Sequence, residues 1–548
     1  MKRFYGFTAL ALVMATPGWA LSPQEAWDAL QQYYLRAGLE LTTEGEAVEG
    51  DALVVRNVQS AQDQQGVSIH LEFGDMRFEP AEADAVRALV ADQGRGEVTV
   101  DTPDGPMTMP ITMNYPGAVT TISGTAGDMT FQSVMPTLEM VMVANVPDDG
   151  KTVEMPITLR ATGLELTDQV TGTTDMTSTQ EFSVQRVEMA LSGRETATAE
   201  DVDVSELTGR DREAAKHGHS DNDNRLVALD ALIGIDGISG NARSVMPEAA
   251  TTAMADGDMS AAMRAGFDVN AVINYTGMSI TGSMEGVDDD GETETGSMEM
   301  TGGAGSLSVA MNSNQLGYQA ALDSLDVTVN SNELPSPVNL TVGPQAVDVQ
   351  LPALAGDAPQ PFKIANSAEN IVLSDSTWDL FDEERALPRE PASFDIDLTG
   401  NVVMNRDLMD RETEELMNRL NDPELTDDQR DEIINQVMEM GSPADPRDVS
   451  INQFALSLLG ASITANGQLE VPEGGSVDAP VGNLSARYEG VNALLDTLGA
   501  AGIIPADQMM GVRMGLMMFA RADGEDRMVT DLEFREDGSI FANGQQVR

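Results

Sequence analysis

Histidine and carboxylate side chains are the most obvious candidates for chemistry in this sequence. His217 and His219 lie close to Asp221 and Asp223 within a strongly polar stretch. Zinc and copper accept imidazole and carboxylate ligands, but a structural metal site requires four ligands that surrounding contacts hold in place. A polar stretch of this kind offers no such support. We therefore predict a solvated linker and no metal site at these residues.

A second group of carboxylates raises the question of calcium. Five acids fall within seven residues: Asp288, Asp289, Asp290, Glu292 and Glu294. Hard cations bind clustered carboxylates, but the twelve-residue calcium loop places its acids at alternating positions before a central glycine and ends in a glutamate. The stretch departs from that pattern. A solvated hairpin tip is the favoured interpretation, and a calcium-binding acidic surface remains the alternative.

Methionines recur two residues apart at three places. The pairs are Met107 with Met109, Met140 with Met142, and Met298 with Met300. Thioether sulfur is a ligand for copper(I). A spacing of two in a strand also places both side chains on one face, as core packing requires. We predict that these methionines pack in the protein core and bind no metal.

Nucleotide-binding and hydrolytic motifs are incomplete. The tripeptide Gly150, Lys151 and Thr152 resembles the end of a phosphate-binding loop, which needs another glycine five residues earlier and a helix afterwards. Asn145 occupies the earlier position, and the residues from Val153 onward alternate as a strand. No nucleophile elbow, serine–lysine pair or zincin motif is present either. We predict no catalytic residues and no cofactor, and regard a hydrolase as the weakest alternative.

The net charge restricts the partners of this protein. The 548 residues carry a formal charge of −59 and contain no cysteine. Such a charge repels nucleic acid and anionic lipid headgroups, so we expect no nucleic-acid partner. Without cysteine there is no disulfide framework and no thiol nucleophile.

The first twenty residues are typical of a secretory signal peptide. Lys2 and Arg3 precede an apolar run at residues 4–14, and Gly18 and Ala20 supply the small residues expected before a cleavage site. We expect cleavage after Ala20 and a periplasmic location. The apolar run is too short to span a membrane, and charges interrupt the later apolar stretch at residues 498–520, so we predict no transmembrane segment in the mature chain.

Alternating apolar residues predict a mainly β fold. Val67, Ile69 and Leu71 are one example of a period of two, which is repeated along most of the chain. We predict long, curved antiparallel sheets with helical-hairpin insertions. A capping box at residues 22–25 predicts an opening helix, and a helical interruption is expected near residues 81–91.

Changes in composition divide the chain into sections. Residues 199–266 contain a polar linker, a short strand at 226–235 and an alanine- and methionine-rich helix at 247–265. The predicted sections are a signal peptide at 1–20, a helix and β section at 21–198, the interruption at 199–266, a second β section at 267–403, a helical hairpin at 404–441, and strands, a helical pair and a closing hairpin at 449–548.

The stretch at residues 371–403 holds the candidate site residues. Two strand-like arms flank a corner at which Pro388 and Pro391 exclude a helix and a central strand. Trp378, Leu380 and Phe381 lie beside that corner. We predict that these five residues have a structural role, with surface recognition as the alternative.

The corner also carries a resemblance to a known family. Residues 375–382 (DSTWDLFD), 387–392 (LPREPA) and 395–400 (DIDLTG) resemble the "domain of unknown function 2125" family of exported alphaproteobacterial proteins. The resemblance implies a periplasmic β-rich protein without an assigned activity. At the level of architecture the chain is also similar to AsmA-type envelope proteins, which handle lipids.

These observations favour a non-enzymatic protein of the cell envelope. One-sided apolar strands predict a long sheet whose apolar face binds a lipid, another hydrophobic ligand or an envelope protein. The alternative is a structural or interaction module with the acidic, calcium-binding surface described above.

Overall fold

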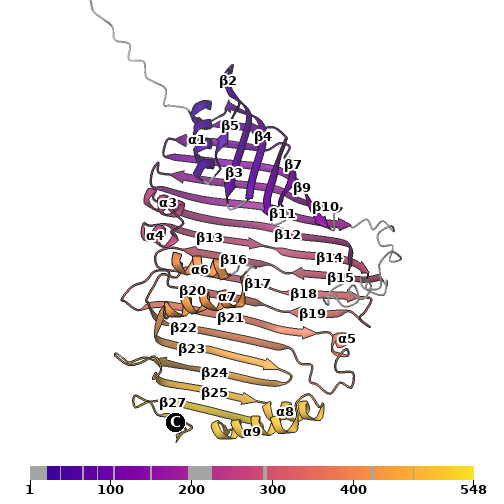
Figure 1. The fold of residues 1–548 in the computed structure, drawn as a ribbon, viewed down its shortest axis with the longest axis vertical. Helices are drawn as coiled ribbons and strands as arrows, with labels where there is room; N and C mark the ends of the chain where they lie inside the picture. The colour runs from indigo at the N-terminus through magenta and orange to yellow at the C-terminus, as the bar shows by residue number, and fades with distance from the viewer. Residues whose placement is uncertain are drawn as a thin grey trace, which may run out of the picture.

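The computed structural model describes residues 21–36, 39–64, 67–82, 84–102, 105–148, 151–194, 225–287, 293–420, 425–472 and 474–548. The strands of these residues form one large antiparallel sheet (Figure 1). The predicted mainly β fold with helical insertions is therefore confirmed. The signal peptide, the His217–Asp223 cluster and the acids at 288–290 and 292 lie outside the described residues.

The N-terminal part of the sheet packs against the first helix. Its elements are α1 (Pro23–Arg36), β1 (Leu41–Thr42), β2 (Gly45–Glu49), β3 (Ala52–Gln64), β4 (Val67–Pro80), β5 (Val86–Val90), β6 (Gln93–Thr102), β7 (Gly105–Asn114), β8 (Val119–Thr125) and β9 (Asp128–Asp148). The predicted capping box is present, because the Ser22 backbone N–H donates to Glu25 at 2.8 Å and the Glu25 N–H donates to the Ser22 hydroxyl at 3.2 Å. Trp27 is fully buried on this helix and contacts the Phe78 ring at 5.6 Å.

The middle of the molecule is a broad sheet of long strands. Its elements are β10 (Lys151–Thr171), β11 (Met176–Arg194), β12 (Arg225–Met246), α3 (Glu248–Ala255), α4 (Met259–Arg264), β13 (Asp268–Tyr275), β14 (Gly277–Val287), β15 (Thr293–Gly302), β16 (Gly305–Met311), β17 (Leu316–Leu322), β18 (Leu325–Ser331), β19 (Val338–Val342), β20 (Gln345–Leu351) and β21 (Gln360–Leu373). β12 pairs with β11 on one side and with β13 and β14 on the other. The hydrogen-bonded sheet therefore continues through the segment that we predicted to separate two β sections.

The C-terminal part adds further strands and most of the helices. Its elements are α5 (Asp375–Trp378), β22 (Ala392–Met404), α6 (Arg411–Leu420), α7 (Asp427–Glu439), β23 (Ala444–Leu458), β24 (Ala461–Glu470), β25 (Val481–Glu489), α8 (Val491–Ala500), α9 (Ala506–Phe519), β26 (Arg521–Ala522), β27 (Arg527–Phe534), β28 (Ile540–Ala542) and β29 (Gln545–Gln546). Figure 1 shows α8 and α9 at the end of the sheet farthest from α1. Both predicted helical pairs are present.

A line of backbone kinks, which we call the seam, crosses the middle of the sheet. Gly163, Gly237 and Asn370 interrupt β10, β12 and β21 with φ values of +61°, +58° and +52°. Between β12 and β21, each crossing of the sheet is divided into two strands at the same line. β13, β16, β17 and β20 lie on one side of it, and β14, β15, β18 and β19 lie on the other.

Backbone hydrogen bonds continue across the seam. The Thr276 N–H donates to the Asp236 carbonyl at 2.9 Å, and the Gly303 N–H donates to the Ser324 carbonyl at 2.9 Å. A residue in the left-handed region bends a strand and re-aims the side chains that follow it. Where a crossing is divided into two strands, the apolar positions also change, from odd numbers in β13 to even numbers in β14.

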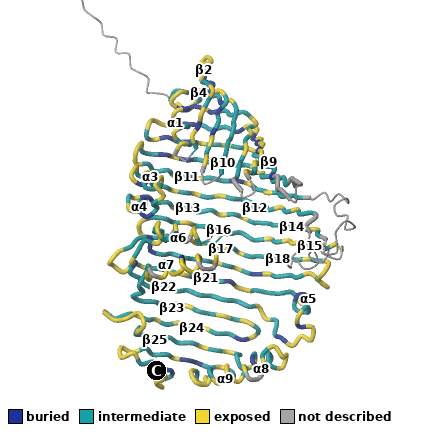
Figure 2. The backbone as a smooth tube through the Cα atoms, in the orientation of Figure 1, coloured by how far each residue is buried: buried dark blue, intermediate teal, exposed yellow. Residues whose placement is uncertain are grey.

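Burial is concentrated at the N-terminal end of the sheet. Its largest cluster of buried apolar residues joins α1 to β3, β4, β5, β8 and β9, with Val55, Phe78 and Ile122 fully buried. Figure 2 shows mainly intermediate exposure along the strands from β12 to β25. These strands are therefore much less covered than the strands that surround α1.

Two of the predicted helical segments are corrected by the structure. The helix expected at residues 81–91 is wrong, because Val86–Val90 forms β5 between β4 and β8 with Val86 fully buried. The helix expected at 247–265 consists of α3 and α4, separated at Gly257 with φ +74°. The strand expected at 226–235 is longer and extends over the whole of β12.

Candidate hydrophobic-ligand face

Strand register aligns one row of mostly apolar residues across the sheet. Directly opposed residues of an antiparallel pair lie on the same face. The row, which we call the apolar row, consists of Phe131, Asp168, Gln180, Ala242, Ala271, Val309, Tyr318, Val349, Ile364, Leu398, Ile451, Gly467, Leu484, Leu532 and Ala542. The face of the sheet that carries it is called the apolar face.

The opposite face is polar. The positions next to the apolar row include Ser308, Gln319 and Asp348, which are paired across β16, β17 and β20. Lys363 binds the Asp348 carboxylate at 2.8 Å, and Gln319 donates to it at 3.1 Å. Burial alone would raise the pKa of Asp348, but the hydrogen bonds from Lys363, Gln350 and Gln319 outweigh it and lower that pKa. This side of the sheet is suited to water.

The apolar face runs across the seam without changing sides. A Cβ atom placed on Gly302 would lie 2.5 Å from Met278 Cγ on one half of the sheet and 3.4 Å from Leu322 Cδ1 on the other. Side chains from both halves therefore meet above Gly302. At the seam, successive apolar positions are three residues apart instead of two, as Tyr275 and Met278 show. This change in spacing keeps the apolar side chains of both halves on one face.

Several side chains of this face lie flat over a glycine of the next strand. Cβ atoms placed on Gly305 and Gly400 would lie 2.2 Å from the Tyr275 hydroxyl oxygen and 2.7 Å from Phe362 Cε1. A sheet without a second layer leaves its apolar side chains without partners above them. Aromatic rings over glycines supply part of the missing contact.

The middle of the apolar row remains accessible. The exposed fractions are 36% for Val309, 47% for Tyr318 and 38% for Ile364. These three residues lie on neighbouring or nearby strands, and large exposed apolar patches of this kind are uncommon in folded proteins unless they bind a partner.

An apolar pocket opens on this face. Its volume is about 250 Å³, and its lining residues are Leu351, Pro352, Phe362, Ile364, Val402, Met404, Leu408, Pro443 and Ala444. The lining comes from β20, β21 and β22 together with the segments that lead into and out of the α6–α7 hairpin. Figure 1 shows this hairpin in front of the middle strands. The pocket therefore lies where the hairpin meets the apolar row.

Helix α1 covers the N-terminal end of the apolar row. Its Tyr33 ring contacts Phe131 at 4.7 Å. Asp168, which is fully buried, accepts hydrogen bonds from the Ser178 hydroxyl at 2.6 Å and the Gln180 amide at 3.0 Å. Burial, followed by the nearby Asp168 carboxylate, raises the pKa of Tyr33, so the phenol stays protonated and donates to that carboxylate. This end of the row is closed.

A second cavity lies beside α1. It has a volume of about 550 Å³ and is lined by Leu21, Glu25, Asp28, Ala29 and Gln32 of the helix region and by residues 124–127, Met129, Phe131, Val170, Gly172 and Thr173 of the sheet. Its mixture of acids and apolar groups contrasts with the wholly apolar lining of the smaller pocket. The smaller pocket is therefore the better match to a hydrocarbon chain.

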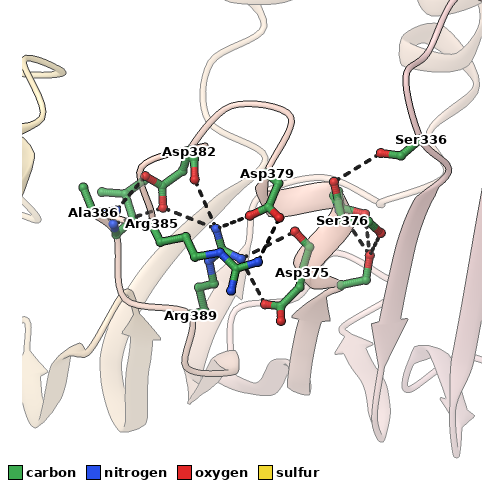
Figure 3. A network of polar contacts seen from close by, with 11 residues as sticks. Ser336, Asp375, Ser376, Asp379, Asp382, Arg385, Ala386 and Arg389 are labelled. Carbon is green, nitrogen blue, oxygen red and sulfur yellow. Dashed lines mark hydrogen bonds and ion pairs between the residues drawn. The ribbon is translucent and has the colours of Figure 1, made fainter.

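The corner between β21 and β22 is organised by an arginine that was not among the candidate residues (Figure 3). Arg389 Nη1 binds Asp375 at 3.0 Å, and its Nη2 binds Asp379 at 2.8 Å. Asp382 is buried and accepts the backbone N–H groups of Ala386 and Leu387 at 2.8 and 3.1 Å. The hydrogen bonds from Arg389 and then Arg385 lower the pKa of Asp379. Ion pairs and hydrogen bonds therefore hold the loop at the corner in one conformation.

The five candidate residues of the corner occupy different environments. Trp378 is half-buried and contacts the Phe381 ring at 5.0 Å and the Arg389 guanidinium at 5.8 Å. Phe381 is 61% exposed and Pro391 is also exposed, whereas Leu380 and Pro388 are half-buried. Their structural or recognition role stays a prediction. The sequence signal for the network was the group of acids that precedes Arg389, namely Asp375, Asp379 and Asp382.

Candidate ligands for a metal ion are sparse in the described parts of the chain. Within those residues, no group of three or more histidine and acidic side chains is arranged to hold a metal ion. Met140 and Met142 pack beside a buried cluster that includes Ile111 and Met113. This position agrees with the predicted packing role of that pair. Calcium binding at 288–294 stays a prediction.

Comparisons with known proteins match the C-terminal part of the chain to one family model. In the described residues, no helix is long and apolar enough to cross a membrane. No curated protein and no solved structure matches the chain. The likeness to AsmA-type proteins therefore stays a prediction. Residues 306–544, which include the corner motif, match the family model described as "Uncharacterized protein conserved in bacteria (DUF2125)", and this match confirms the predicted resemblance to that family.

Proposed function

We propose that this protein binds a hydrophobic ligand, such as a lipid acyl chain, on its apolar face, and that it does so in the periplasm. The observation that carries the proposal is the accessible middle of the apolar row at Val309, Tyr318 and Ile364. A hydrocarbon chain laid along this row would remove apolar surface from water, which stabilises a complex by about 25 cal/mol for each Å² buried.

The geometry of the face suits an elongated ligand. The apolar row crosses fifteen strands, and neighbouring strands lie about 4.8 Å apart. The apolar pocket beside Phe362 and Leu408 offers a more enclosed place for one end of a chain. The polar side of the same strands supplies no comparable surface.

Lipid extraction and native mass spectrometry test the proposal. Protein purified from its own compartment is expected to carry a hydrophobic molecule that organic solvent removes. The delipidated protein is then titrated with cis-parinaric acid, a fluorescent fatty acid. Protein without a bound molecule that also fails to take up this probe would contradict the proposal.

A matched pair of variants locates the binding site. Tyr318→Ser with Ile364→Ser removes two accessible apolar side chains and is expected to weaken probe binding about tenfold. Ala365→Ser changes the neighbouring residue of β21, which points to the polar face, and is expected to bind like the wild type. Equal binding by the double variant would place the ligand elsewhere.

A further inference from the structure

Helix α9 exposes a broad apolar surface at the C-terminal end of the sheet. The exposed residues of α9 and of the turn before it are Ile503, Met510, Val512, Met514, Met517, Met518 and Phe519. Met509, Arg513 and Leu516 are half-buried and follow one another at helical spacing, so they mark the side that faces the protein. The apolar side chains on the rest of the helix are exposed.

The width of this surface distinguishes between kinds of partner. With 3.6 residues in each turn, the exposed positions cover more than half of the helix circumference. A helix that docks in a protein groove uses a narrower stripe. A helix that lies in the surface of a bilayer immerses a wide apolar side. With 14 residues, α9 is too short to span the hydrocarbon core.

Charge narrows the choice of partner further. Between residues 508 and 519, Arg513 is the one charged residue, and its guanidinium binds Asp496 of α8 at 2.5 Å. The protein as a whole carries a charge of −59, which opposes a second copy and an anionic surface. An uncharged apolar surface on an acidic protein matches a lipid surface without net charge.

The apolar face of the sheet leads toward this helix pair. Leu456 and Leu458 of β23 are exposed, and Leu458 lies opposite Ala461 of β24. Helix α8 contacts β24. Exposed residues of the apolar face, Leu456 and Leu458, therefore lie at the same end of the molecule as α8 and α9.

We propose that α9 binds the surface of a bilayer of zwitterionic lipid, with its methionine side chains among the upper acyl-chain segments. Methionine has an unbranched, flexible side chain that fills irregular apolar gaps, so it suits a fluid surface. This contact goes beyond ligand binding on the sheet, because it uses residues that do not line the apolar row or its pocket.

Vesicle flotation tests this membrane contact. Full-length mature protein is mixed with phosphatidylcholine vesicles, and the bound fraction rises with the vesicles in a density gradient. Wild-type protein is expected to float with them and to bind less well when phosphatidylglycerol is added. Failure to float, or binding that requires phosphatidylglycerol, would overturn the proposal.

Two glutamate variants form the matched comparison. Met514→Glu with Met517→Glu places charges on the exposed side of α9 and is expected to reduce vesicle binding by at least about tenfold. Met438→Glu on α7 serves as the control, since Met438 is 68% exposed and Met517 is 72% exposed. Circular dichroism establishes that both variants are folded. Equal loss in both, or in neither, would contradict a specific role for α9.

A tryptophan reporter separates the bilayer from a second copy of the chain. Met517→Trp is expected to shift its emission to the blue and to be quenched by bromine-labelled phosphatidylcholine. Light scattering that shows dimers lost in the glutamate variant, without vesicle binding by the wild type, would assign the surface to self-association and overturn the proposal. Parinaric acid binding is measured separately with the Tyr318 and Ile364 variants, so failure of one proposal leaves the other testable.

Discussion

Single residues set the curvature and closeness of the strands. Gly400 lies where a Cβ atom would come within 2.1 Å of the Asp448 carbonyl oxygen and 2.7 Å of Phe362 Cε1. The backbone contact cannot be relieved by rotating a side chain. This position therefore requires glycine for reasons of space.

Gly400→Ala is expected to destabilise the protein by about 2 to 4 kcal/mol, because strands β22 and β23 must separate to admit the methyl group. Urea unfolding measures the change. Gly511→Ala is the control, since Gly511 is on α9 and a methyl group added there would meet no neighbouring atom within 4 Å. Alanine at that position is expected to stabilise the helix by up to about 1 kcal/mol. A Gly400 variant as stable as the wild type would show that the strands adjust freely.

A second single residue, Arg389, stabilises the corner between β21 and β22. Arg389→Ala removes hydrogen bonds to Asp375 and Asp379 and leaves the buried Asp382 without its nearby cation, so we expect a loss of about 2 to 3 kcal/mol in urea unfolding. Arg385→Ala removes an exposed ion pair with Asp379 and is expected to cost below about 1 kcal/mol. Similar losses in the two variants would contradict the central role of Arg389.

At the scale of elements, a partly buried ion pair joins distant helices and loops. Asp407 precedes α6, and its carboxylate accepts the Ala355 backbone N–H at 2.8 Å and the Arg264 guanidinium of α4 at 2.6 Å. The hydrogen bond from Arg264 lowers the pKa of Asp407 against the opposing effect of burial. The base of the α6–α7 hairpin is thereby attached to α4 and to the loop between β20 and β21.

Asp407→Asn is expected to lower the unfolding free energy by about 1 to 2 kcal/mol near neutral pH. A carboxyl group whose pKa falls on folding stabilises the native state above its unfolded pKa, which is about 3.9, and this contribution disappears as the pH falls through the folded pKa. The difference between variant and wild type should therefore shrink below about pH 4. Glu415→Gln on α6, in an exposed pair with Arg411, is the control and should show little difference at any pH. A constant difference for Asp407 would show that its charge is not responsible.

The same scale shows which parts of the fold the sequence could predict. Alternation of apolar residues predicts most strands, because each strand has one apolar and one polar side. Residues 86–90 were misassigned because alanine favours a helix, whereas burial between two other strands decides the outcome. The sequence contained no clear signal for the seam. A single residue with positive φ affects one strand, and the alignment of such residues in different strands depends on how the strands pair in the folded protein. Arg389 was visible in the corner motif, but its three acidic neighbours meet only after the loop folds.

At the scale of the whole molecule, stability is unevenly distributed. The N-terminal end packs α1 against several strands, while the middle of the sheet has accessible residues on its apolar face. Local opening follows the amount of buried apolar surface. The two ends of β9, one beside α1 and the other beside β7, both belong to the better packed region.

Hydrogen–deuterium exchange is expected to reflect this difference. Amides of β3, β5 and β8 should exchange more slowly than amides of β16, β17 and β20, because their side chains are more deeply buried. Binding of parinaric acid on the apolar face should slow exchange in the second group and leave the first unchanged. Uniform exchange across both groups would show that the sheet unfolds as one unit.

The seam also determines how the length of the molecule can change. Between β12 and β21 the chain crosses the sheet four times, and each crossing consists of one strand on either side of the seam. Between β4 and β9, two crossings fill the corresponding space. Adding one outward and one returning crossing would lengthen the molecule by about 10 Å and replace only the strand pairing at the point of insertion. The number of such crossings therefore sets the length of the sheet. Duplication or deletion of a pair of crossings in the gene would produce a longer or shorter version of the same surface.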